Sequence, residues 1–173
     1  MFEINATDLR WLAGMDEEDD LCLHGNAVAR IGDEILAYED ATVSATALYL
    51  LKSLTEDHVN TGIAMLSLDG FNLIACDNMN TCVILGGLYG WPNGIDWAVI
   101  HEGNDIVKFA TNSGEETRIT LGEYKKAVYT FVDEIESFYR KSAPKRIPDD
   151  KENRNGYIAF WNEWHRRRKQ ERE

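Results

Sequence analysis

Three short runs of residues in the second half of the chain constrain the fold more than any other feature of the sequence. Each run has the alternation or the β-branched composition of a strand, and between the runs lie the turn sequences Gly103-Asn104 and Asn112-Ser113-Gly114. Turns this short join neighbouring strands of opposite direction, so the sequence predicts an antiparallel meander. The three runs are Ile95–Glu102, Ile106–Thr111 and Thr117–Thr120.

Three other segments have the apolar periodicity of helices. In Val43–Leu54 and Tyr124–Tyr139 the large apolar side chains recur at helical spacing. Thr120 and Glu123 have the spacing of a capping box, in which each residue satisfies an amide at the start of the second helix. A third helix is expected to begin between Asp149 and Gly156 and to run toward the end of the chain.

The first 40 residues predict further strands. Phe2–Ala6 is expected to be an edge strand, and Leu21–Ile31 and Glu34–Tyr38 flank a Gly-Asp turn. We therefore expect one α+β domain over residues 1–173: an antiparallel sheet of about five to seven strands with about three helices packed on it. A basic C-terminal helix, 154–169, is expected to pack on the body and to end in a frayed tail.

Charge is sorted along the chain. Residues 1–139 contain 24 Asp and Glu against 7 Lys and Arg, whereas residues 140–173 contain 6 against 11. This distribution predicts an acidic body and a basic tail that meet electrostatically. The net charge of −12 argues against general binding to nucleic acid or to an anionic membrane. It favours a basic protein partner.

Other features of the sequence predict a cytoplasmic location. No apolar run approaches the roughly 20 residues that span a bilayer, and the first residues lack the basic and apolar parts of a secretion signal. The three cysteines are few and scattered, which is typical of free thiols in a reducing compartment. The sequence makes no prediction about oligomeric state.

An acidic surface is the first candidate for partner binding. Five consecutive acidic residues repel one another and predict a solvated loop, and two more acidic residues follow nearby in sequence. Together they form a negative face that steers a basic partner. The alternative interpretation is a loop that only keeps the protein soluble. The seven residues are Asp16, Glu17, Glu18, Asp19, Asp20, Asp33 and Glu34.

The C-terminal helix carries a stripe of aromatic side chains followed by basic residues. This pattern is compatible with insertion into a groove on a partner or with an arm that binds nucleic acid. We favour packing against the chain's own body, because exposed apolar patches of this size are rare on monomers. The stripe consists of Tyr157, Phe160, Trp161, Trp164 and Arg168.

A possible ligand pocket lies around the turn that precedes the meander. Aromatic walls with a few polar groups are common in ligand pockets, although the turn can equally be a structural corner whose indoles fill the core. Asp96 and His101 lie on opposite faces of the expected strand, which argues against a direct acid–base pair. We therefore assign no catalytic residue. The pocket residues are Trp91, Asn93, Asp96, Trp97 and His101.

A zinc site is disfavoured. Cys22 and His24 are separated by one residue, and Cys76 and Cys82 by five, whereas structural zinc ligands usually form tighter pairs. Buried free thiols explain the same residues. We expect no metal and no cofactor.

Two motifs resemble a family of small uncharacterised bacterial proteins. They are Pro92-Asn93-Gly94-Ile95-Asp96-Trp97 and the segment from Gly156 to Arg168, GYIAFWNEWHRRR. The resemblance implies a bacterial, cytosolic protein and transfers no catalytic residue. A looser likeness to bacterial immunity proteins rests on size and acidity.

The sequence thus favours a non-enzymatic, acidic protein-binding module, such as an immunity-type inhibitor of a basic toxin or nuclease. The alternative is a small-molecule binding protein or enzyme with a pocket near Gly90–Trp97 and His101. A mimic of nucleic-acid charge remains a third hypothesis.

Overall fold

The computed structural model describes residues 1–59, 62–68, 72–85 and 94–170. Within them the chain forms three α-helices and ten short strands in four small antiparallel sheets. The α+β class and the three helices predicted from sequence are confirmed, but the strands are divided among four sheets instead of forming one. The helices are α1 (Val43–Ser53), α2 (Leu121–Lys141) and α3 (Lys151–Lys169), with a short 3-10 helix, η1, at Asp77–Met79.

The first sheet contains the N-terminal strands in the order β1-β2-β3, so β1 and β3 are its edges. A two-residue turn at Gly32-Asp33 joins β2 to β3, as the turn sequence predicts. Side chains alternate between a buried face, which includes Phe2 and Ile4, and an exposed face. The strands are β1 (Phe2–Arg10), β2 (His24–Ile31) and β3 (Glu34–Thr42).

The predicted meander forms the second sheet, in the order β10-β9-β8. Its strands are β8 (Trp97–Gly103), β9 (Ile106–Thr111) and β10 (Glu116–Thr120). The two remaining sheets have two strands each and lie in the part of the chain that the sequence describes least clearly. They pair β4 (Leu66–Ser67) with β7 (Gly94–Ile95), and β5 (Asn72–Cys76) with β6 (Thr81–Leu85).

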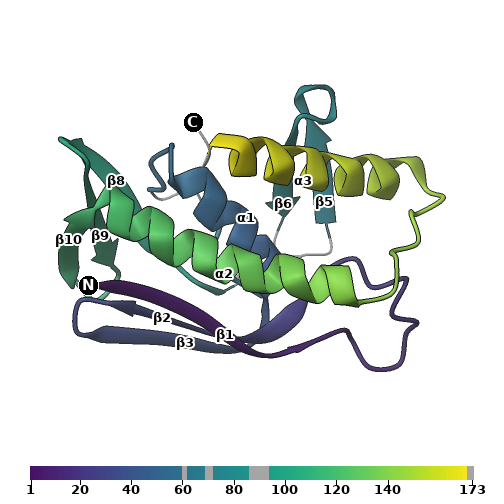
Figure 1. Cartoon of the computed structure of the whole chain (residues 1–173), viewed down its shortest axis with the longest axis horizontal. Coiled ribbons are helices and arrows are strands. Elements are labelled where there is room, and N and C mark those ends of the chain that lie inside the picture. Colours follow the sequence, from purple (N-terminus) through teal and green to yellow (C-terminus); the bar gives the residue numbers. More distant parts are fainter. Residues whose placement is uncertain (60–61, 69–71, 86–93, 171–173) are drawn as a thin grey trace.

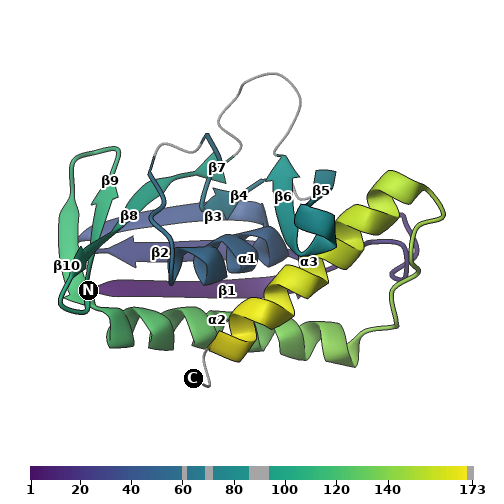
Figure 2. The ribbon, with the colours of Figure 1, turned by 90° about the horizontal axis from the view of Figure 1, so that it is seen from above.

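The helices form the layers above the first sheet. In Figure 1, α1 and α2 lie over this sheet and α3 lies above them. Seen from above, α2 runs beside β1 along the edge of the sheet, and α3 crosses toward β5 and β6 (Figure 2). The capping box at the start of α2 is present, since the Thr120 side chain accepts from the Glu123 amide and the Glu123 carboxylate accepts from the Thr120 amide.

Aromatic side chains join the layers. Phe2 of β1 stacks on Phe109 of β9 at 4.7 Å between ring centroids, and Tyr124 of α2 packs edge-on against both rings. On α3, Tyr157, Phe160 and Trp164 are buried, so these three side chains of the aromatic stripe pack inside the chain's own body. The predicted frayed tail falls largely on residues 171–173, outside the described residues.

Candidate functional site

The acidic run Asp16–Asp20 lies in the loop between β1 and β2, where it contacts the segment between α2 and α3. The guanidinium of Arg146 pairs with Glu18 at 2.8 Å and with Asp19 at 2.6 Å. The backbone amide of Arg146 also donates to the Glu18 carbonyl. The basic tail therefore neutralises part of the run, while Asp16 is exposed and has no ion pair among the described residues.

Glu17 and Asp20 stabilise the same loop through hydrogen bonds. Glu17 accepts from a backbone amide of the segment between α2 and α3, at 2.8 Å. Asp20 is only 2% exposed and accepts from the amides of Leu12 at 2.7 Å and Cys22 at 3.3 Å. Burial alone raises the pKa of Asp20, but hydrogen bonds from His24 and the two amides outweigh it and hold this pKa below its ordinary value. Asp20 is thus an internal group.

Asp33 and Glu34 lie at the opposite end of the first sheet, in and just after the β2–β3 turn. The length of β1 separates them from Asp16–Asp20, and a strand of nine residues extends roughly 30 Å at about 3.3 Å per residue. The Glu34 carboxylate accepts from the hydroxyls of Ser113 at 2.6 Å and Thr111 at 2.5 Å, and these bonds lower its pKa. The structure therefore places the seven acidic residues in two separate groups.

The predicted pocket residues have different environments. Trp91 and Asn93 lie outside the described residues. Trp97 is 1% exposed, and its indole packs against Phe2 with ring centroids 6.2 Å apart, so its side chain belongs to the core. Asp96 and His101 do not pair with each other; each contacts a residue of the segment that follows α1.

Two His–Asp pairs lie side by side where this segment meets β8. The backbones of His58 and Val99 exchange two hydrogen bonds, which hold the segment against the strand. The Nε2 atom of buried His58 lies 2.7 Å from the Asp96 carboxylate. An imidazole oriented by a carboxylate is a common arrangement of a general base. Sequence analysis missed His58, because it lies 38 positions before Asp96 in the sequence.

The second pair contains His101 and Asp57. Asp57 accepts from the His101 amide and from His101 Nδ1, each at 2.9 Å, and these bonds lower the pKa of Asp57. His101 Nε2 lies 3.3 Å from the carbonyl oxygen of Leu54, which caps α1. Both ring nitrogens of His101 therefore face oxygen atoms of the segment that follows α1 or of the end of that helix.

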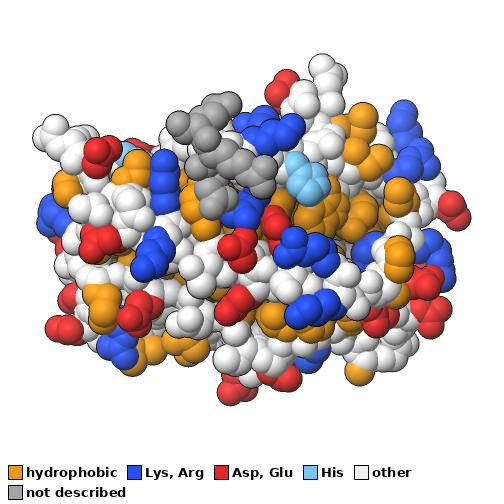
Figure 3. Space-filling view, viewed as in Figure 1, with side chains coloured by type: hydrophobic (Ala, Val, Ile, Leu, Met, Phe, Trp, Pro, Cys, Tyr) orange, Lys and Arg blue, Asp and Glu red, His pale blue; other side chains and the backbone are white. Residues whose placement is uncertain are grey.

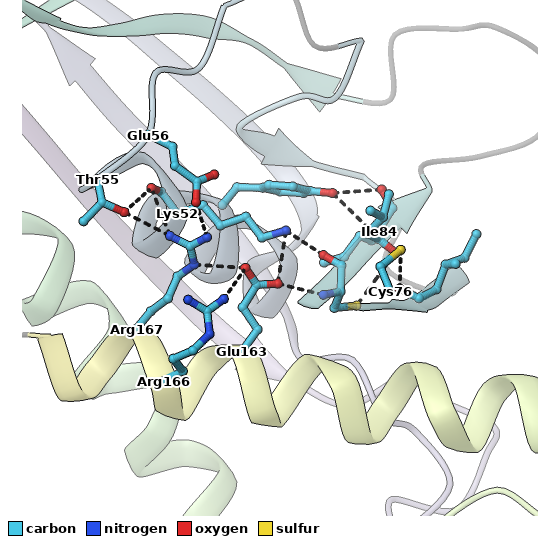
Figure 4. A network of polar contacts seen from close by, with 12 residues as sticks. Lys52, Thr55, Glu56, Cys76, Ile84, Glu163, Arg166 and Arg167 are labelled. Atoms are coloured by element: carbon cyan, nitrogen blue, oxygen red, sulfur yellow. Dashed lines mark hydrogen bonds and ion pairs between the residues drawn. The ribbon is translucent and has the colours of Figure 1, made fainter. Parts of the chain in front are cut away.

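A buried ionic network holds α3 on the body (Figure 4). Glu163 is 1% exposed and lies 2.9 Å from Arg167 Nε and 3.2 Å from Lys52 Nζ. It also accepts from the Cys82 amide of β6 at 2.7 Å. Arg167, 5% exposed, continues the network to Glu56. These contacts hold α3 on the body, so Arg167 of the basic C-terminal segment has a structural role.

An open groove runs between β1 and α2. It consists of two cavities of about 810 and 630 Å³ that share Thr130. Together they follow β1 from Phe2 to Leu9 and α2 from Glu123 to Lys141. We call this the β1–α2 groove. No sequence motif marks it, because its two walls come from segments that are far apart in the sequence.

The three cysteines are free thiols. Cys22 and Cys82 are buried, and burial raises the pKa of each thiol to about 12. In the described part of the chain, no three His, Cys, Asp or Glu side chains are grouped so that they could hold a metal ion.

None of the described helices combines the length and the apolar character that crossing a bilayer requires. Comparison with protein-family models, with curated proteins and with solved structures finds no match to this chain.

Proposed function

We propose that this chain is a non-enzymatic, acidic protein-binding module that engages a basic protein partner, as an immunity-type inhibitor neutralises a basic toxin or nuclease. The observation that supports this proposal is that the basic C-terminal segment forms ion pairs with the rest of the chain. Arg146, Arg167 and Arg168 pair with acidic residues of the body, so the segment folds back onto the chain. The molecule as a whole keeps its net charge of −12.

The surface distribution of charge agrees with this proposal. On the face that carries α2 and α3, Lys and Arg side chains are interspersed with Asp and Glu (Figure 3). The basic segment therefore does not form a separate cationic surface there. A negative excess of this size attracts a basic partner over several ångströms and raises its association rate at low salt.

The proposal is tested by the salt dependence of association. A partner is captured from the native host and identified, and its association rate constant is measured between about 20 and about 300 mM salt. We expect a basic partner whose association rate falls at least about tenfold over this range, because salt screens long-range attraction. A neutral or acidic partner, or a rate that does not depend on salt, contradicts the proposal.

Matched charge variants sharpen this test. Asp16→Asn with Asp33→Asn removes two exposed acids, and Lys151→Gln with Lys169→Gln removes two exposed bases. The first double variant should associate more slowly than the parent and the second faster, because they change the net charge by two units in opposite directions. Equal rates for both variants would exclude steering.

The two His–Asp pairs support a second candidate, a small-molecule binding protein or enzyme near Gly90–Trp97 and His101. In this alternative, His58 acts as a base oriented by Asp96. A small-molecule screen by thermal shift tests it, with His58→Gln as the matched variant. A ligand that stabilises the parent but not the folded variant favours this function. The absence of any such ligand favours the binding module.

A further inference from the structure

A further pocket lies where the loop between β1 and β2 meets the start of α3. Both ribbon views place this loop beside the connection between α2 and α3 (Figure 1 and Figure 2). The cavity has a volume of about 220 Å³. Eight described residues line it: five belong to the loop, and the others are Leu73 of β5, Pro148 of the connection and Asn153 of α3. We call it the loop pocket.

The loop pocket is open at one end and closed at the other. Met15 and Asn153, which line it, are exposed, so the opening lies beside them. Asp20, Cys22 and Leu73 are buried and form its inner end. The space beyond Cys22 and Leu73 is too small for a water molecule, so the pocket ends there.

The inner walls are mainly apolar. Leu21 and Leu73 contribute aliphatic side chains, and Pro148 contributes its ring. The thiol of Cys22 is protonated at neutral pH, because burial raises its pKa to about 12. A buried water molecule needs about two to four polar partners, and walls of this kind supply few. The inner part of the pocket therefore favours an apolar group over water.

Two carboxylates also line the pocket, but both are already compensated. Asp19 pairs with Arg146 at 2.6 Å, and Asp20 accepts from two backbone amides at 2.7 and 3.3 Å. A cation in the pocket would lose its hydration without gaining a free counter-charge, and an anion would be repelled by both carboxylates. The charges of the pocket thus favour an uncharged ligand.

The volume and the opening define this ligand further. An apolar cavity of roughly 150 Å³ binds benzene, so the loop pocket has room for about nine non-hydrogen atoms. At the opening, the Asn153 backbone amide caps the start of α3 by donating to Asp150 at 2.9 Å. The Asn153 carboxamide has no hydrogen-bond partner among the described residues. Because a carboxamide both donates and accepts, it can bind a hydroxyl group.

We propose that the loop pocket binds a small uncharged alcohol of about nine non-hydrogen atoms, with an apolar ring between Leu21, Cys22 and Leu73 and its hydroxyl group beside Asn153. This site goes beyond the proposed function and does not depend on it. It shares no residue with the two His–Asp pairs.

The probe is phenethyl alcohol, which has this size and chemistry, and its binding is measured by NMR titration of the isotope-labelled protein. We expect a dissociation constant at or below about 1 mM, which is reasonable for so small a ligand. The matched controls are phenethylammonium and phenylacetate, which carry the same ring with a positive or a negative charge. Each should bind at least about tenfold more weakly than the alcohol. No binding of the alcohol, or equal or tighter binding of a charged control, overturns the inference.

A matched pair of variants locates the site. Met15 and Leu12 are both exposed apolar residues of the same loop, but only Met15 lines the pocket. Met15→Ala should lower the affinity for phenethyl alcohol at least about threefold, because it removes apolar contact area. Leu12→Ala should leave the affinity unchanged. Equal affinities of the two variants contradict the proposed location.

Filling the inner end of the pocket should prevent binding. Cys22→Leu adds volume at the buried end, and circular dichroism and thermal unfolding show whether the variant folds. In the folded variant the affinity should fall at least about tenfold, and an unchanged affinity overturns the inference. If Cys22→Leu does not fold, the comparison of Met15→Ala with Leu12→Ala decides.

Hydrogen exchange gives a readout that needs no variant. The Arg146 amide donates to the Glu18 carbonyl, and the amides of Leu12 and Cys22 donate to Asp20, so all three lie in or beside the walls of the pocket. At a ligand concentration about ten times the dissociation constant they should exchange about tenfold more slowly, because the loop opens only after the ligand leaves. Unchanged exchange at all three amides shows that the ligand binds elsewhere.

The variant His58→Gln separates this site from the two His–Asp pairs. It should bind phenethyl alcohol as tightly as the parent does, because His58 does not line the loop pocket. Loss of binding in the folded variant would place the ligand at the His–Asp pairs and overturn the inference. The charge of the captured partner bears only on the proposed function.

Discussion

Several charged residues of this protein have internal structural roles. Asp20 and Glu163 are almost fully buried, and each is surrounded by donors. A buried carboxylate is stable only when hydrogen bonds or opposite charges compensate for lost hydration. These two carboxylates therefore stabilise the folded chain.

Glu163→Gln should strongly destabilise the protein. The change leaves Arg167 and Lys52 without their shared counter-charge, and removing one partner of a buried pair costs about 3–5 kcal/mol. Urea unfolding measures the effect. Glu152→Gln, at an exposed position on the same helix, is the control and should change stability by less than about 0.5 kcal/mol. Similar values for the two variants would contradict the role of the network.

Asp20→Asn should change how stability depends on pH. The pKa of Asp20 is lowered in the folded state, so its carboxylate stabilises the fold above the unfolded pKa of about 3.9, and this contribution disappears as pH falls through the folded pKa. We expect the variant to be less stable than the parent at pH 7, by about 1–2 kcal/mol. The difference should shrink at acidic pH.

Urea unfolding midpoints of the parent and of Asp20→Asn, at neutral and at acidic pH, measure the difference in stability at pH 7 and its decrease at acidic pH. Asp16→Asn, in the same loop but exposed, is the control. A difference between parent and Asp20→Asn that stays constant with pH would disprove the assigned role.

At the scale of elements, α3 approaches the β5–β6 hairpin more closely than an ordinary side chain allows. A Cβ atom at Gly156 would lie 1.8 Å from the carbonyl oxygen of Leu73 in β5. Glycine in the middle of a helix normally costs stability relative to alanine. At this position it permits backbone contact between helix and strand.

Two Gly→Ala substitutions should therefore have opposite effects. Gly156→Ala should destabilise the protein by about 2–3 kcal/mol, because the new methyl group collides with the β5 backbone. Gly122→Ala, in the first turn of α2, should stabilise it by about 0.5 kcal/mol, since its nearest neighbour would be 3.9 Å away. Thermal and urea unfolding of both variants show whether each substitution raises or lowers the free energy of unfolding. Stabilisation by Gly156→Ala would show that α3 packs differently.

At the scale of the whole molecule, two electrostatic effects compete. Exposed ion pairs such as Arg146 with Glu18 and Asp19 favour the fold, but water and salt screen them, so each such pair contributes little. The net charge of −12 opposes the compact state through self-repulsion. Salt screens both effects, whereas it screens the buried Glu163–Arg167 pair much less.

We therefore expect salt to stabilise the protein. Raising sodium chloride from about 20 to about 300 mM should increase the melting temperature by about 2–4 °C, which corresponds to roughly 1 kcal/mol for a chain of this size. Differential scanning calorimetry measures the shift, with potassium chloride at the same ionic strength as a control for specific ion effects. A falling melting temperature would show that exposed ion pairs outweigh repulsion.

The sequence by itself determined the local elements. The capping box at Thr120, the meander over 95–120 and the aromatic stripe on α3 depend on contacts between residues close in sequence or on the alternation of apolar side chains, so they could be read from spacing. The meeting of the acidic body with the basic tail could also be predicted, because it follows from net charge.

Only the tertiary structure decided which residues meet across the chain. It separates Asp33 from the acidic run, pairs His58 with Asp96, buries Asp20 and forms the β1–α2 groove from segments that are far apart in the sequence. Such contacts depend on how elements pack, and packing is the sum of many weak interactions that no local spacing encodes. The division of the strands into four small sheets has the same origin, since strand pairing is set by long-range contacts.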